Sequence, residues 1–143
     1  MWEIEGLLDK KVFYKNIETK ERYNRVMIKF ICYPKCSTCK KAEKWLNENG
    51  VNFTVRDIKE NNPSFDELKE WYDMSGLELK KFFNTSGMLY RSMGLKDKLN
   101  NMSEEEQLKL LSTDGMLVKR PIVIKGNKVL IGFKEKEWEN VLK

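Results

Sequence analysis

Hydrophobic and polar positions change from strand-like to helix-like spacing and back between residues 27 and 57. Residues 27–33 are mostly apolar and end at Pro34, which is typical of a short buried strand. In residues 37–49, apolar side chains recur every three or four positions, and Gly50 follows, which predicts a helix closed by glycine. Residues 51–57 alternate as in a second strand. This order predicts a βαβ unit with parallel strands and a right-handed crossover.

The middle of the chain predicts a group of short helices. Two capping boxes, Ser64 with Glu67 and Ser103 with Glu106, mark helix starts, because serine caps the backbone and glutamate reaches back to it. The predicted helical segments are residues 65–72, 78–83, 88–93 and 104–111, with a loop at 84–87.

The last part of the chain returns to strands. Residues 121–124 and 129–131 flank Gly126-Asn127, a two-residue hairpin signal, and residues 135–142 predict a closing helix. The order βαβ, helices, ββα predicts an α/β fold over residues 27–143. Residues 1–26 show no sustained helical or strand periodicity, and we interpret them as an N-terminal extension of unclear role.

Composition narrows the class of protein. The chain has 143 residues, of which 41% are hydrophobic and 34% charged, as in a globular domain. The net charge of +5 comes from interspersed residues, which gives no support to direct nucleic-acid binding. No apolar run approaches the roughly 20 residues needed to span a bilayer, and the first residues lack a signal peptide's features. We therefore expect a cytoplasmic protein that does not act at a membrane.

The candidate chemistry rests on cysteine. The chain has three cysteines and no histidine, which excludes Cys-His pairs, Ser-His-Asp triads and histidine-bound metals. An odd cysteine count in a cytoplasmic protein also argues against a structural disulfide framework. Cys36-Ser37-Thr38-Cys39 lies between a predicted strand and helix, where unpaired backbone N–H groups stabilise a thiolate. The spacing assigns Cys36 as nucleophile and Cys39 as the thiol that resolves a mixed disulfide.

Three other interpretations of the cysteines stay open at this point. Cys36 and Cys39 can be small apolar residues at a helix start. Cys32, Cys36 and Cys39 also match the C-x3-C-x2-C spacing of radical-SAM iron–sulfur loops. The expected strand position of Cys32 and the short chain disfavour that cluster, and a zinc site lacks a fourth ligand. We therefore expect no metal, and Cys32 is predicted to be a buried strand residue.

Four longer segments of the sequence resemble a known protein family. The segments Tyr33–Ala42, Phe82–Gly87, Leu95–Lys98 and Asp114–Ile122 resemble the ArsC/Spx family of arsenate-reductase-like proteins and Spx-type regulators. The resemblance covers residues 27–143 and implies a thioredoxin-like core with a helical insertion between its two halves.

The same resemblance implies roles for residues outside the cysteine motif. Cys36 matches the family's reactive cysteine, Arg120 matches an arginine that holds an oxyanion, and Pro121 is expected to be a cis-proline facing the cysteine. Asn84 and a residue near Phe133 stand where arsenate reductases have two further arginines. Arsenate binding is weakened by these replacements, because a doubly charged oxyanion needs several charge-assisted donors.

Three functions follow from these observations. The first is a thiol–disulfide redox protein that uses Cys36 and Cys39 without a bound cofactor, with electrons from a thioredoxin, a glutaredoxin or a low-molecular-weight thiol. The alternative is a Spx-type redox-sensing regulator that binds the RNA polymerase α subunit; Gly76 only loosely matches the glycine of that contact. The third is a true arsenate reductase.

Overall fold

The computed structural model describes the backbone of residues 2–7 and 10–14 and the whole of residues 27–143. Its strands and helices follow in the order β1 (Trp2–Leu7), β2 (Lys10–Tyr14), β3 (Ile28–Cys32), α2 (Ser37–Glu48), β4 (Phe53–Asp57), α3 (Phe65–Ser75), η1 (Leu79–Phe82), α4 (Met88–Ser92), α5 (Leu95–Lys98), η2 (Leu99–Asn101), α6 (Glu104–Leu111), η3 (Gly115–Leu117), β5 (Ile122–Lys125), β6 (Lys128–Ile131) and α7 (Glu135–Leu142).

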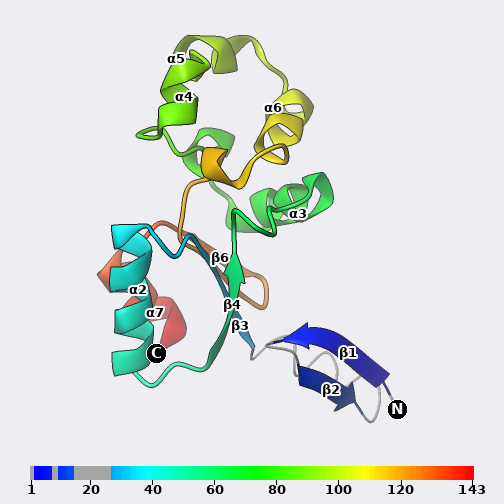
Figure 1. Cartoon of the computed structure of the whole chain (residues 1–143), viewed down its shortest axis with the longest axis vertical. Coiled ribbons are helices and arrows are strands. Elements are labelled where there is room, and N and C mark those ends of the chain that lie inside the picture. The colour runs from blue at the N-terminus through cyan, green and yellow to red at the C-terminus, as the bar shows by residue number, and fades with distance from the viewer. Residues whose placement is uncertain (1, 8–9, 15–26) are drawn as a thin grey trace.

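A four-stranded mixed sheet forms the centre of the domain (Figure 1). Its strand order is β4-β3-β5-β6, with β3 parallel to β4 and antiparallel to β5, and with β5 and β6 forming a hairpin. Gly126 turns this hairpin at φ 59°, a conformation that glycine adopts without steric cost. The parallel pair and the hairpin confirm the predicted βαβ and ββα halves of an α/β, thioredoxin-like core.

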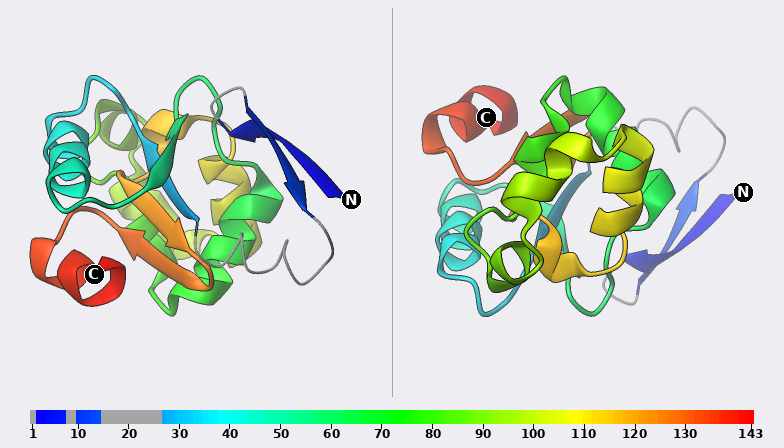
Figure 2. Two further views of the ribbon diagram at one scale, coloured as in Figure 1. Left: turned by 90° about the horizontal axis from the view of Figure 1, so that it is seen from below. Right: turned by 90° about the horizontal axis from the view of Figure 1, so that it is seen from above.

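The two faces of the sheet bury different helices. Alternate strand residues point to opposite faces, so Ile28, Phe30 and Cys32 pack in one cluster with the buried sides of α2 and α7. Ile31 and Ile122 pack in a second cluster with the helical insertion between β4 and β5. Figure 2 shows α2 and α7 lying together beside the sheet, apart from the insertion. Cys32 therefore lies on the face that α2 covers.

The predicted helix starts are confirmed. The Ser64 and Ser103 side chains each accept a hydrogen bond from the backbone N–H of their capping-box glutamate. Both glutamate carboxylates in turn accept a hydrogen bond from the serine backbone N–H. The helix predicted at 37–49 ends one residue earlier, and the strand predicted at 51–57 begins at Phe53. Within the described residues, no helix is both long enough and apolar enough to cross a membrane.

The main difference from the sequence interpretation lies in residues 1–26. Residues 2–7 and 10–14 pair as an antiparallel hairpin, whereas the sequence showed no strand periodicity there. The register shifts between Ile4 and Leu7. Residues 12–14 are apolar at three consecutive positions, so the sequence there lacks the alternation that identifies a strand. Residues 1, 8–9 and 15–26, which complete the proposed N-terminal extension, lie outside the described residues.

Candidate functional site

The first candidate residue, Cys36, occupies the N-cap of α2. The chain leaves β3 at Cys32 and turns at once, because the Cys36 N–H donates to the Tyr33 carbonyl at 2.9 Å. The backbone of Cys36 is extended, and its carbonyl accepts the first helical hydrogen bond from Lys40. The side chain is half-buried, and no acidic residue stands in the first turn of the helix. The thiol is therefore reachable and lies at the end of the helix that favours an anion.

Cys39 lies one turn further along and is only 2% exposed. Its sulfur accepts a hydrogen bond from the Tyr33 N–H at 3.3 Å, and it shares an apolar cluster with Cys32, against which Cys36 packs. Its interaction with Cys32, and next the burial, raise the pKa of the Cys39 thiol well above its ordinary value. Cys39 is thus a buried thiol one turn from the half-buried Cys36, as a resolving cysteine must be.

Arg120 reaches the cysteine loop through Tyr33, a residue that the sequence analysis did not single out as functional. The guanidinium carbon lies 5.4 Å from the centre of the Tyr33 ring. Arg120 also donates to the Met116 and Val118 carbonyls at 3.5 and 3.4 Å, long distances that indicate weak bonds. Its Nε is buried and has no hydrogen-bond partner among the described residues. Part of the donor capacity of Arg120 is therefore left for a ligand.

Pro121 and Asn84 lie on neighbouring segments of the same region. The Arg120–Pro121 peptide bond is cis, as the resemblance implied, and Pro121 is buried. The Asn84 N–H donates to the Leu117 carbonyl at 2.8 Å, so the loop after η1 runs beside the segment that leads into Arg120. No hydrogen bond among the described residues joins Asn84 to Cys36 or Cys39. The structure brings Asn84 to the Arg120 segment, and the cysteines meet that segment through Tyr33.

Phe133 contributes packing to this region. Its ring lies 4.8 Å from the Trp138 ring, edge to face, and it packs against the cluster that contains Cys39. Such a side chain offers no charge and no hydrogen-bond donor to an oxyanion.

The described residues include no group of three or more His, Cys, Asp or Glu side chains arranged to hold a metal ion. Cys32 is a buried strand residue, 3% exposed, as the sequence predicted. Its contact with Cys39 was not predicted. The sequence feature that could have indicated this proximity is the alternation of side chains along the strand. Cys32 shares its strand face with Ile28 and Phe30, and the helix that carries Cys39 covers that face.

Comparison with known proteins identifies relatives of this chain. The chain is 58% identical over 110 residues to YusI of Bacillus subtilis, covering 77% of this chain and 93% of that protein. It is 26% identical over 107 residues to the global transcriptional regulator Spx 2 of Bacillus anthracis, covering 75% and 80% of the two chains.

Solved structures give the same result. An ArsC family related protein from Bacteroides fragilis superposes with a TM-score of 0.79 at 54% identity, covering 81% of this chain and 97% of that one. The model of the ArsC family matches residues 32–141, which include all the candidate site residues. The chain belongs to the ArsC family.

Proposed function

We propose that this protein is a cytoplasmic thiol–disulfide oxidoreductase in which Cys36 attacks the substrate and Cys39 resolves the product. The observation that carries the proposal is the pairing of a half-buried thiol at a helix start with a buried thiol one turn along the same helix. The N-terminal end of a helix favours an anion, and the thiolate is the form of cysteine that attacks disulfides.

The proposed reaction has two exchange steps. The Cys36 thiolate attacks one sulfur of a disulfide substrate, forms a mixed disulfide and releases the other half as a thiolate. Cys39 then loses its proton and attacks the Cys36 sulfur, which releases the second half. The substrate is reduced by two electrons, and the protein is left with a Cys36–Cys39 disulfide. A thioredoxin, a glutaredoxin or a low-molecular-weight thiol reduces this disulfide and completes the cycle.

Arg120, Pro121 and Asn84 are proposed to position the substrate. The Arg120 guanidinium lies over the Tyr33 ring, and its Nη1 group makes only long bonds to protein carbonyls, so it can donate to a carbonyl or carboxylate of the substrate. We place Pro121 and Asn84 at the border of the same surface because their segments flank Arg120.

A trapping experiment tests the assignment of the two cysteines. Cys39→Ser is treated with bis(2-hydroxyethyl) disulfide and examined by intact mass and peptide mapping, with Cys36→Ser as the matched control. We expect Cys39→Ser to retain a mercaptoethanol adduct on Cys36, whereas the wild-type protein resolves it. The proposal fails if the adduct forms on neither variant or forms equally on Cys39 of Cys36→Ser.

A redox-sensing regulator is the second proposed function, because the chain is similar to a transcriptional regulator over most of its length. The test uses purified RNA polymerase α subunit and measures its binding to the protein in dithiothreitol and after diamide oxidation. This function is supported if binding changes on oxidation and if that change is lost in Cys36→Ser. Equal or absent binding in both conditions rejects it.

A further inference from the structure

Cys32 is the one thiol that the proposed reaction does not use. It is the last residue of β3, and its carbonyl accepts the Ile58 N–H at 2.8 Å, which holds it at the end of the strand. Its side chain belongs to the same apolar cluster as Cys39, with Cys36 packed against that cluster. Cys32 is 3% exposed, so solvent oxidants and reductants have almost no direct access to it.

Cys39 and Cys32 are buried in one apolar cluster, and Cys36 packs against that cluster. The Tyr33 N–H holds the Cys39 sulfur in place between the strand and the helix. A sulfur with one thiol neighbour on each side can pair with either, since disulfide exchange transfers a bond from one neighbour to another.

We propose that Cys32 is a third redox-active thiol, which attacks the Cys39 sulfur of the Cys36–Cys39 disulfide and forms a buried Cys32–Cys39 disulfide. In this step the bond between Cys36 and Cys39 breaks and the bond between Cys32 and Cys39 forms. The proton of Cys32 passes to the departing Cys36 thiolate, and no electrons are gained or lost. The inference rests on the proposed function, because that reaction supplies the first disulfide.

The surroundings favour this direction of exchange. Cys36 leaves as a thiolate at the N-terminal end of α2, where the helix dipole favours an anion, and a favoured thiolate is the better leaving group. The oxidised pair is then shielded from solvent, while Cys36 is free to react again.

Trypsin distinguishes the two disulfides without ambiguity. Cleavage after Lys29, Lys35 and Lys40 places Cys32 in peptide 30–35 and both other cysteines in peptide 36–40. A Cys36–Cys39 disulfide stays within one peptide, whereas a Cys32–Cys39 disulfide links the two.

The experiment oxidises the wild-type protein and Cys36→Ser with diamide, quenches with acid and alkylates before digestion. We expect Cys36→Ser to lose both remaining free thiols and to yield the linked peptides. In the wild type, the internal disulfide of peptide 36–40 should form first and convert to the linked pair with time. Cys39→Ser is the matched control and should give no linkage, because Cys32 and Cys36 lack their shared neighbour.

The proposal requires the linked peptides in both the wild type and Cys36→Ser, and their absence from either overturns it. Far-ultraviolet circular dichroism establishes that each variant is folded, and the half-buried position of Cys36 makes a serine there easy to accommodate. Failure of the proposed function gives a different result. In that case the wild type never forms the internal disulfide of peptide 36–40, even at the earliest times of oxidation.

Discussion

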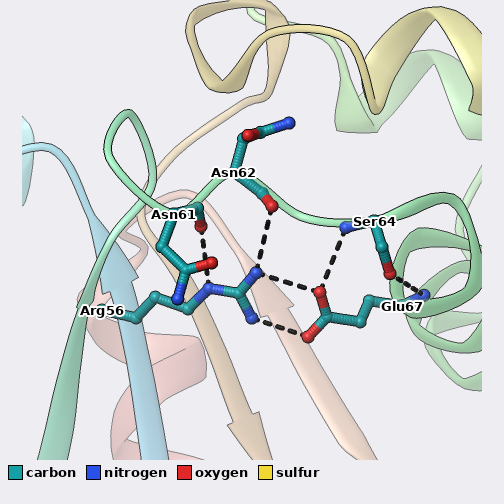
Figure 3. Close-up of polar contacts among 5 residues, drawn as sticks. All are labelled: Arg56, Asn61, Asn62, Ser64 and Glu67. Atoms are coloured by element: carbon teal, nitrogen blue, oxygen red, sulfur yellow. Dashed lines mark hydrogen bonds and ion pairs between the residues drawn. The ribbon is translucent and has the colours of Figure 1, made fainter.

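Arg56 holds the end of β4 to the start of α3, and its replacement should destabilise the domain measurably. Its guanidinium forms a paired contact with the Glu67 carboxylate at 2.6 and 2.9 Å (Figure 3). It also donates to the Asn61 and Asn62 carbonyls at 2.9 and 3.2 Å. Glu67 in turn caps α3 by accepting the Ser64 N–H. One side chain therefore orders the turn between a strand and a helix.

The magnitude follows from these contacts. The side chains of Arg56 and Glu67 are 23% and 39% exposed, so solvent screens the ion pair. Even with paired geometry, such a contact is worth about 1 kcal/mol. Each bond to a backbone carbonyl adds about 0.5 kcal/mol net, because water replaces the lost donor at this partly exposed turn. Arg56→Met, which keeps a long unbranched side chain but removes the guanidinium, should therefore cost about 2 kcal/mol of unfolding free energy.

Urea unfolding followed by tryptophan fluorescence measures this cost. A slope of about 1–3 kcal/mol/M converts the loss into a fall of about 1 M in the unfolding midpoint. The matched control is Lys69→Met, which breaks the Lys69–Asp73 pair at 3.4 Å, where both side chains are more than half exposed. That change should cost less than about 0.5 kcal/mol. Equal midpoints for the two variants would refute the reasoning.

The same pair has a defined pH dependence. The hydrogen bond from Arg56 holds the pKa of the Glu67 carboxyl below its ordinary value of 4.5. A lowered folded-state pKa stabilises the protein above the unfolded value, and this contribution is lost as the pH falls through the folded-state pKa. The stability gap between the wild type and Arg56→Met should therefore be constant at neutral pH and shrink as the solution is acidified below pH 4.5. A gap that widens on acidification contradicts this assignment.

Three further predictions concern the site and its supports. Iodoacetamide should modify Cys36 in Cys39→Ser much faster than it modifies Cys39 in Cys36→Ser, because Cys39 is only 2% exposed, and similar rates in alkylation time courses would contradict the assigned roles. Arsenate reduction coupled to glutaredoxin or thioredoxin should be weak or absent, because Arg120 is the one charged donor among the three positions where arsenate reductases have arginines. Robust arsenate-dependent NADPH oxidation that disappears in Cys36→Ser would reject this prediction. Gly115→Ala should destabilise the domain by about 1–3 kcal/mol in urea unfolding, because an added Cβ overlaps the Ile58 carbonyl, and a neutral result would contradict the packing described.

Local patterns predicted the elements that carry the cysteine motif. The apolar run before Pro34, the glycine after α2 and the two capping boxes each act over a few residues, so the sequence alone revealed them. The β1–β2 pair was missed because residues 12–14 are apolar at three consecutive positions, which breaks the alternation on which a strand prediction depends.

Contacts between distant segments were harder to foresee. The stacking of Arg120 on Tyr33 joins the two halves of the domain, and nothing within either segment reports it. The proximity of Cys32 and Cys39 depends on which strand face carries Cys32 and on which face α2 covers. The sequence indicates the first of these, and the fold supplies the second. Their combination required the sheet order, in which β3 lies in the centre.

A redox titration tests the central claim most directly, namely that Cys36 and Cys39 form a reversible dithiol–disulfide pair. Cys32→Ala isolates that pair, and it is equilibrated over a range of reduced and oxidised dithiothreitol, quenched with acid, alkylated and digested with trypsin. The account predicts that peptide 36–40 converts reversibly, with one midpoint, from a doubly alkylated form to an internal disulfide. A peptide that stays doubly alkylated in the most oxidising buffers, in a folded protein, would contradict the account.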